Sequence, residues 1–375
     1  MGKVTTSLNE KLENVEWGDF KFNDNLFELC KVKNKLSKAE LDITGRVPVY
    51  SSESTNNGII GYTNEKPDFS INKENQVYVV FGDHTRSFNI AKSCFCVADN
   101  TKVLSVENPL ISDKSLMFIN SSWKKSIPDK GYSRHWSVAQ QISFKLPVKQ
   151  GKPDFEFMER FITELEAERI AELGAYLAVT GLSDCELTED ERKALDDFTN
   201  DDIEWGKFNL KDLFGLATRG RRLKSSDRIK GKTPFVTAGE TNQGISAFIG
   251  NDVTVFNKNT VTIDMFGSAK YRNHSYGADD HVAVVHTENL DKFASIFVTT
   301  SAHKVANAGQ FDYGRNFYAK DADALNIQLP VKTNSSNPNY SAMELLISAI
   351  QKIVIKDVVV YADKKIQAHK EVIHS

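Results

Sequence analysis

The sequence contains no long hydrophobic run and few cysteines. No stretch of about 18 consecutive apolar residues occurs, and the mean hydropathy is -0.39, so the sequence predicts no membrane span and no membrane partner. Four cysteines among 375 residues are too few for a disulfide scaffold. The first residues also lack the basic and apolar segments of a secretory signal. We therefore expect a cytoplasmic protein with reduced thiols.

Motifs for catalysis and nucleotide binding are missing as well. Gly231-Lys232-Thr233 resembles the end of a phosphate-binding loop, but Ser226 occupies the place of the first glycine, which lets backbone N–H groups surround a phosphate. The sequence has no Asn/Asp-Pro-Pro-aromatic tetrad of the kind that holds a target amino group, and no methyl-donor site. It therefore predicts no catalytic residue and no cofactor site in this chain.

The cysteines, histidines and carboxylates predict no metal site. Cys94 and Cys96 lie one residue apart and would point to opposite faces of a strand, so we interpret them as buried structural thiols. Asp279-Asp280-His281 combines carboxylates with an imidazole, but no serine or cysteine nucleophile lies in a recognisable elbow. Asp264 with Lys270 is similar to a nuclease carboxylate–lysine pair, which would need a second metal-binding carboxylate.

The net charge of -3 conceals a strong asymmetry along the chain. Residues 14–149 hold 18 Lys/Arg against 15 Asp/Glu, and residues 203–332 hold 17 against 13. Residues 150–202 hold only 5 against 16. Two mildly basic bodies therefore flank an acidic connector, and the overall charge does not exclude a nucleic-acid partner.

The chain contains a long internal repeat. Val15-Glu16-Trp17-Gly18-Asp19-Phe20 recurs as Ile203-Glu204-Trp205-Gly206-Lys207-Phe208. Further matches keep the same order: Leu26-Phe27 with Leu213-Phe214, Gly45 and Pro48 with Gly231 and Pro234, Gly58-Ile59 with Gly244-Ile245, Phe81-Gly82 with Phe266-Gly267, Tyr132 and Arg134 with Tyr313 and Arg315, Leu146-Pro147-Val148-Lys149 with Leu329-Pro330-Val331-Lys332, and Met158-Glu159 with Met343-Glu344. The chain therefore consists of two copies of one unit of about 185 residues, each a body followed by a shorter tail.

The bodies predict strands and the tails predict helices. β-Branched runs bounded by Gly, Asn and Asp predict strands at 77–81, 103–106, 261–263 and 281–285. Apolar residues recur at helical spacing from Phe155 to Val179, after a capping Pro153-Asp154 and before a terminating Gly181. Residues 343–361 follow helical spacing too; two β-branched runs there would also suit a strand, but the repeat favours a helix.

The strongest binding signal is a basic loop at one place in each copy. In the second copy Arg219, Arg221, Arg222 and Lys224 fall within six residues, and in the first copy the loop carries Lys31, Lys33 and Lys35. A solvated surface is one interpretation, because lysine clusters often serve only solubility. The guanidinium groups favour contacts with phosphate or guanine.

Two further positions carry side chains that suit base contacts. Loops are expected at Lys270-Tyr271-Arg272 in the second copy and at His84 and Arg86 in the first. Both segments mix cations with aromatic rings, and we therefore expect them to contact bases. Asn56-Asn57 and Asn242-Gln243 precede the repeated Gly-Ile pair, and carboxamides bond adenine edges in the major groove. A plain turn is an equally good interpretation of these carboxamides.

The ordered duplicate motifs resemble those of the specificity subunits of type I restriction-modification systems, and of the similar separate subunits of type IIB systems. The resemblance rests on Trp-Gly-x-Phe with Leu-Phe, Gly-x-x-Pro, Gly-Ile, the Phe-Gly turn, Tyr-x-Arg, and Leu-Pro before a helix with Met-Glu. It covers nearly the whole chain. Thr163-Glu164-Leu165-Glu166 looks like the Thr-Ala-Glu-Leu element of the family's central helix, with Glu in place of Ala.

This resemblance implies a subunit that reads double-stranded DNA and has no chemistry of its own. The implied fold is α+β: two mostly-β target-recognition domains (14–149 and 203–332), joined by long helices (154–198 and 340–372) that pack as an antiparallel coiled-coil spacer. Partners would be adenine methyltransferase subunits, which carry S-adenosylmethionine, and restriction subunits. The helix residues expected to contact partners are Met158, Ile162, Leu165, Met343, Ile347 and Ile350.

Two other classes of protein remain open from the residues alone. The repeat could be a duplicated catalytic fold of a stand-alone enzyme, in which Asp83-His84 and Asp279-Asp280-His281 act on a small substrate. It could also be a protein-interaction scaffold that binds no nucleic acid. Salt-sensitive binding to duplex DNA together with copurifying methyltransferase subunits distinguishes the DNA-reading subunit from both.

Overall fold

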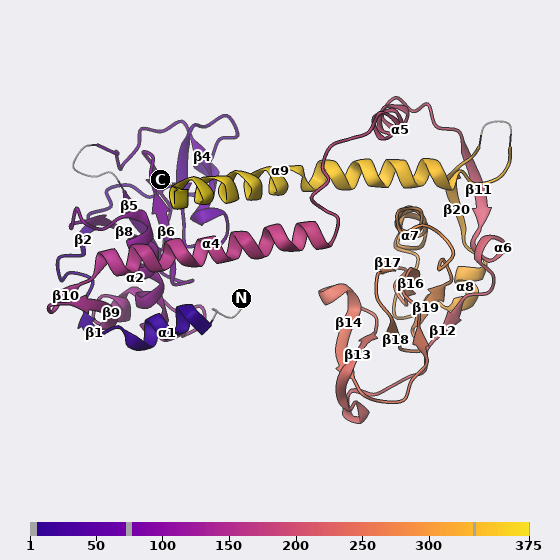
Figure 1. Cartoon of the computed structure of the whole chain (residues 1–375), viewed down its shortest axis with the longest axis horizontal. Coiled ribbons are helices and arrows are strands. Elements are labelled where there is room, and N and C mark those ends of the chain that lie inside the picture. The colour runs from indigo at the N-terminus through magenta and orange to yellow at the C-terminus, as the bar shows by residue number, and fades with distance from the viewer. Residues whose placement is uncertain (1–5, 73–76, 333–334, 375) are drawn as a thin grey trace. The chain divides into compact units, whose positions relative to one another are not determined.

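The structure is a computed structural model that describes residues 6–72, 77–332 and 335–374. It contains two compact units, Met1–Leu173 with His369–Ser375, and Gly174–Ala368. Each unit holds small β-sheets with short helices, and the unit boundaries fall inside two long helices (Figure 1). Among the described residues, no helix combines the length and the apolar character that a membrane crossing needs.

The first unit is a mixed body of sheets and helices. Its elements are α1 Thr6–Asn14, β1 Trp17–Phe20, β2 Phe27–Cys30, η1 Lys38–Glu40, β3 Val47–Tyr50, η2 Asn56–Gly58, β4 Ile59–Thr63, β5 Tyr78–Gly82, β6 Ser87–Ala91, β7 Cys96–Val97, β8 Thr101–Val106, α2 Asp113–Ser126, α3 Trp136–Ala139, β9 Phe144–Lys149, β10 Lys152–Pro153 and α4 Phe155–Val179. The main sheet has the order β2-β8-β5-β6, a smaller sheet has the order β4-β3-β7, and β9 pairs with both β1 and β10.

The second unit repeats this architecture. Its elements are α5 Glu189–Thr199, β11 Trp205–Asn209, α6 Leu210–Phe214, β12 Thr218–Arg219, η3 Ser225–Asp227, β13 Lys230–Val236, η4 Thr241–Gly244, β14 Ile245–Ile249, β15 Val255–Phe256, β16 Thr260–Asp264, β17 Ala269–Arg272, β18 Tyr276–Ala278, β19 Val282–Val285, α7 Lys292–Ala306, α8 Ala319–Asp323, β20 Asn326–Pro330 and α9 Tyr340–His374. The main sheet has the order β12-β19-β16-β17, the second sheet has the order β14-β13-β18-β15, and β11 pairs with β20.

The repeat seen in the sequence is confirmed by equivalent pairings. Trp17 of β1 lies opposite Pro147 of β9, and Trp205 of β11 lies opposite Pro330 of β20. The first glycines of the two Gly-x-x-Pro motifs are needed for close backbone approach. A Cβ atom on Gly45 would lie 2.5 Å from the backbone nitrogen of Thr63, and one on Gly231 would lie 2.4 Å from that of Gly250. These equivalent pairings and contacts confirm an α+β fold with two copies of one body.

One repeat match is out of register. Phe81 lies inside β5, whereas Phe266 lies in the turn that follows β16. The strand residues that face the helix-covered core are Val79 and Phe81 in the first body, and Val261 and Ile263 in the second. The predicted equivalence of the two Phe-Gly pairs is therefore wrong, because each pair has a different place relative to its hairpin turn.

Helix α4 begins and ends where the helical spacing predicts, at Phe155 and Val179, but the predicted helical segment 154–198 is not continuous, because α5 begins separately at Glu189. The carboxylate of Asp154 accepts a hydrogen bond from the backbone nitrogen of Phe157 at 2.9 Å, which caps α4. α4 ends at Val179, and Gly181 then adopts a left-handed conformation with φ of 70°. Residues 340–374 form one continuous helix, α9, so the helical interpretation of the second tail is confirmed.

The two methionines expected to contact partners lie instead in the cores. Met158 and Met343 are both fully buried, each packed within its own unit, so the prediction that they contact a partner is wrong. Their equivalence in the repeat gives the reason, since each anchors the first turn of a long helix to its body. The other four expected residues are more open: Ile162, Leu165 and Ile347 are half-buried against the cores, and Ile350 is 38% exposed.

The acidic connector is clamped to α9 within the second unit. Thr188 and Glu191 form a capping box at the start of α5, and Glu191 also accepts hydrogen bonds from Ser348 at 2.6 Å and Lys352 at 3.1 Å. Lys352 forms a second ion pair with Asp184 at 2.9 Å. Burial raises the pKa of Glu191, but the hydrogen bonds from Ser348, Thr188 and Lys352 outweigh this effect and lower it to about 2.

Candidate nucleic-acid interface

The basic loop of the second body is held by its backbone and presents its cations to solvent. Gly220 approaches the β18 strand so closely that a Cβ atom would lie 1.6 Å from the backbone oxygen of Ala278. The backbone nitrogen of Leu223 donates to the carboxylate of Asp279 at 3.2 Å. The loop's four cations are exposed, and none of them forms an ion pair with any described residue: Arg219, Arg221, Arg222 and Lys224. Four unpaired cations on an anchored loop suit a polyanion.

The basic loop of the first body follows β2, and its counterpart begins at Arg219, the last residue of β12. Its anchor is a hydrogen bond from the backbone nitrogen of Leu36 to the backbone oxygen of Val97, at 2.9 Å. Lys31, Lys33 and Lys35 are exposed, and Lys35 forms an ion pair with Asp99 at 3.2 Å. The two loops thus occupy one place in the repeated body, as predicted, but the first has lower free positive charge.

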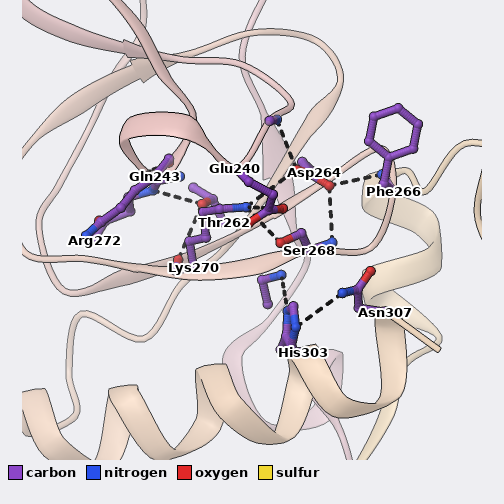
Figure 2. A network of polar contacts seen from close by, with 12 residues as sticks. Glu240, Gln243, Thr262, Asp264, Phe266, Ser268, Lys270, Arg272, His303 and Asn307 are labelled. Atoms are coloured by element: carbon purple, nitrogen blue, oxygen red, sulfur yellow. Dashed lines mark hydrogen bonds and ion pairs between the residues drawn. The ribbon is translucent and has the colours of Figure 1, made fainter. Parts of the chain in front are cut away.

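The segment Lys270-Tyr271-Arg272 forms strand β17, so the predicted loop is wrong here. Arg272 is only 1% exposed and donates from Nε to Thr262 at 2.8 Å and from Nη1 to the backbone oxygen of Gln243 at 2.8 Å (Figure 2). Burial lowers its pKa, and its guanidinium lies over the ring of Tyr276. A side chain in this position supports the turn at Gln243 and does not reach a duplex. Tyr271 is half-buried and donates to Asn259 at 3.0 Å.

Lys270 belongs to an internal network that includes two carboxylates (Figure 2). Its ammonium lies 3.1 Å from Glu240 and 3.6 Å from Asp264. The second carboxylate that a nuclease site would need is therefore present. However, the oxygens of Asp264 accept hydrogen bonds from the backbone nitrogens of Gly239, Phe266 and Ser268, at 3.0 to 3.3 Å. These contacts fix the turn after β16, so we interpret the network as structural.

His84 and Arg86, the predicted counterparts in the first body, lie in the turn between β5 and β6 and are also engaged within the protein. Arg86 donates to the backbone oxygen of Ile127 at 2.9 Å and pairs with Asp129. The ring of His84 stacks on that of Tyr132, with centroids 4.5 Å apart. These contacts hold the segment before α3 and leave Arg86 only 20% exposed at its side chain. A DNA contact by His84 or Arg86 stays a prediction.

The repeated carboxamides stand on a strained turn that recurs in both bodies. Asn56, Asn57 and Gly58 adopt left-handed conformations with φ of 47°, 48° and 77°. The counterparts Asn242, Gln243 and Gly244 have φ of 50°, 55° and 79°. Consecutive left-handed residues other than glycine are costly, and such strain concentrates at functional sites.

The side chains on the two turns have different surroundings. In the first body, Asn57 donates to the backbone oxygen of Ile90 at 2.8 Å and accepts from its nitrogen at 3.0 Å, while Asn56 donates to Ile59 at 3.1 Å. In the second body, the exposed carboxamides of Asn242 and Gln243 have no hydrogen-bond partner among the described residues. The sequence pattern groups both pairs, but only the carboxamides of the second pair have no hydrogen bond to the described residues.

Two of the residues considered for a metal site, Asp279 and Cys96, have structural partners, and Cys94 is only half-buried, so the interpretation of both cysteines as buried holds for Cys96 alone. Asp279, Asp280 and His281 bring ligand atoms within 4.8 Å of one another, but Asp279 accepts the hydrogen bond that anchors the basic loop. The sulfur of Cys96 is buried and donates to the backbone oxygen of Lys66 at 3.6 Å.

The comparisons identify the family of this two-body fold. Residues 14–175 and 202–370 match the type I restriction-modification DNA specificity domain, and the chain belongs to this family. It is similar to a crystal structure of the S subunit of a type I restriction-modification system from M. genitalium, with a TM-score of 0.57 and 15% identity over 96% of this chain and 94% of that one. That likeness extends the shared fold over both bodies and the long helices.

A curated relative is the specificity subunit S.BcgI of a type II restriction enzyme from Heyndrickxia coagulans. The two sequences are 23% identical over 232 residues. The match covers 60% of this chain and 62% of the relative, so it spans less than two thirds of the relative's length.

Proposed function

We propose that this chain is the DNA-reading subunit of a restriction-modification complex and performs no catalytic step itself. Its bodies, 14–149 and 203–332, each read one half of a bipartite duplex target. The observation that carries this proposal is the anchored basic loop at one place in each body, with four exposed and unpaired cations in the second. Exposed guanidinium and ammonium groups neutralise duplex phosphates and release counterions. Membership of the specificity-domain family supports the same function.

The partners of the complex are adenine methyltransferase subunits, which carry S-adenosylmethionine, and restriction subunits, all working on DNA in the cytoplasm. We assign to the segments 154–198 and 340–372 the roles of spacer and partner surface, in an antiparallel coiled coil. Ile350, Val354, Val358 and Tyr361 of α9 are between 38% and 73% exposed and recur at helical spacing, so they form an apolar stripe suited to a partner. The 25 residues of α4 span roughly 37 Å, close to one duplex turn of about 34 to 36 Å.

Duplex binding measured against salt tests the proposal. We expect the full chain with its cognate methyltransferase subunits to bind one bipartite duplex, with an affinity that falls steeply as salt rises. Changing Arg219, Arg221 and Arg222 together to Ala should weaken binding by about 1 to 3 kcal/mol per lost base contact and reduce the salt slope by about one per lost phosphate contact. The matched control changes Lys207 and Lys211 to Ala, because these are exposed cations of the same body outside the loop, and it should leave duplex binding nearly unchanged.

Three results would count against this proposal. If the triple variant binds with unchanged affinity and salt slope, the basic loop is not part of the interface. If the chain methylates or cleaves DNA without its partners, and the activity follows the protein through purification, the stand-alone enzyme is the better interpretation. A chain that binds partners but no duplex would be the interaction scaffold.

A further inference from the structure

The second body carries a groove beside its basic loop. The groove has a volume of about 540 Å³, and its walls come from η4, from β14 and from the loop between β17 and β18. Arg228 joins the groove to the basic loop, because its guanidinium donates to the backbone oxygen of Leu223 at 3.3 Å and to the hydroxyl of Ser246 at 3.2 Å. The groove therefore lies next to the loop to which we assign phosphate contacts.

The lining of this groove suits a nucleobase and not a phosphate. Three carboxamides line it, those of Asn242, Gln243 and Asn273, together with the ring of Phe248, which is 57% exposed. The only titratable lining residue is His274. Burial and the nearby charge of Arg272 lower its pKa, so the imidazole is neutral near pH 7. A lining without formal charge offers hydrogen bonds and apolar contact but no counterion for a phosphate.

The carboxamides are held ready for a ligand. The buried guanidinium of Arg272 donates to the backbone oxygen of Gln243 at 2.8 Å and so supports the left-handed turn that presents Asn242 and Gln243 (Figure 2). The Nδ1 atom of His274 lies 2.7 Å from the carboxamide oxygen of Asn273. That oxygen only accepts, so the imidazole carries its hydrogen on Nδ1 and orients the Asn273 side chain. Fixed donors and acceptors cost less entropy on binding.

Carboxamides next to an apolar ring match one base pair best. A carboxamide donates to N7 of adenine and accepts from N6 in the major groove, while the thymine methyl group seeks apolar contact. We propose that this groove reads an A·T pair in the half-site of the second body, with Asn242, Gln243 and Asn273 facing adenine and Phe248 facing the thymine methyl. The proposal rests on the DNA-reading function above and gives its second half-site a chemical identity.

The first body has a pocket that shares only part of these walls. It measures about 480 Å³ and is lined by η2, β6 and the loop that follows β6, but also by Tyr50 of β3 and Met117 of α2, and by no residue of β4, which follows η2 as β14 follows η4. The carboxamide of Asn57 is engaged there by the backbone of Ile90, and Lys92, which also lines the pocket, forms an ion pair with Asp113. The repeated turn thus offers different chemistry in the two bodies, because its carboxamide is engaged in the first and free in the second.

Base-pair replacement in the mapped target tests the groove. The full chain with its methyltransferase subunits is assayed for binding and methyl transfer on duplexes in which each pair of the second half-site is replaced in turn. The variants are Gln243→Gly, Asn242→Gly and Asn273→Ala. Glycine removes the side chain and keeps the left-handed backbone without strain. Gln328→Ala, at an exposed carboxamide of the same body outside the groove, is the matched control.

We expect wild-type complex to require A·T at one position, and the three variants to reduce discrimination there by roughly 5- to 100-fold while the other positions keep theirs. Unchanged discrimination at every position overturns the proposal, as does an equal loss of affinity for all sequences or relaxation at a G·C pair. Failure of the DNA-reading function itself looks different. In that case wild-type complex discriminates at no position.

Discussion

The clamp between α5 and α9 gives a sharp test of how the connector is held. Glu191 is only 5% exposed and faces Lys352, while its carboxylate oxygens accept hydrogen bonds from the hydroxyl of Ser348 and the backbone nitrogen of Thr188. Changing Glu191→Gln keeps the size of the side chain and removes its charge. Lys352 then loses one ion-pair partner and keeps Asp184. We expect α5 to open more readily, because a buried ammonium is left with weaker compensation.

The magnitude follows from the pKa of Glu191. Its ordinary value is 4.5 and its value in the folded chain is about 2. A depressed pKa means that the charged form stabilises the fold above about pH 4.5, and that this stability is lost as the pH falls toward 2. We expect the loss of the Glu191 charge to cost about 2 kcal/mol of stability at pH 7, which is less than the full free-energy equivalent of the pKa shift. This cost corresponds to roughly a 30-fold change in the opening equilibrium of α5.

Amide hydrogen exchange across residues 189–199 of the full chain measures this opening directly. We expect Glu191→Gln to speed exchange at pH 7, and the difference from wild type to shrink as the pH falls from 5 toward 2. The control is Asp197→Asn, which breaks an exposed pair with Lys193 on the same helix and should change the opening free energy by about 0.5 kcal/mol or less. Equal exchange in wild type and Glu191→Gln at pH 7, or a difference that does not depend on pH, would refute the reasoning.

Three further outcomes are expected. Exchanging residues 14–149 for the same domain of a related protein should alter one half of the target, as read by methylation mapping; a change in both halves would contradict independent reading. Inserting four residues after Glu166 lengthens α4 by about 6 Å. The same half-sites should then be modified, with a spacer between them that is longer by one to two base pairs of about 3.4 Å each. A spacer of unchanged length in an active complex would show that another element sets the distance. Gly220→Ala places a Cβ atom 1.6 Å from the backbone oxygen of Ala278. This substitution should displace the basic loop, cost about 1 to 3 kcal/mol of stability and weaken duplex binding, as the arginine variants do. Normal duplex binding would show that the loop tolerates the displacement.

The sequence by itself determined the duplication, the long helices and the places of the basic loops. These features depend on short-range patterns: helical periodicity and a capping Asp154 define α4, and an ordered set of motifs defines the repeat. The motifs recur because each satisfies one backbone requirement, such as the close approach at Gly45 and Gly231. Local patterns of this kind can be predicted from the sequence without a tertiary structure.

The tertiary structure decided which of the candidate side chains are free. Arg272 and Arg219 are the same residue type, yet one is buried against Thr262 and the other is exposed without an ion pair. Asn57 and Gln243 occupy equivalent places in the repeated turn of the two bodies, but only the side chain of Asn57 is engaged by a neighbouring strand. Residues far apart in the sequence make these contacts, so no local pattern distinguishes a cation or carboxamide that supports the fold from one that is available to DNA.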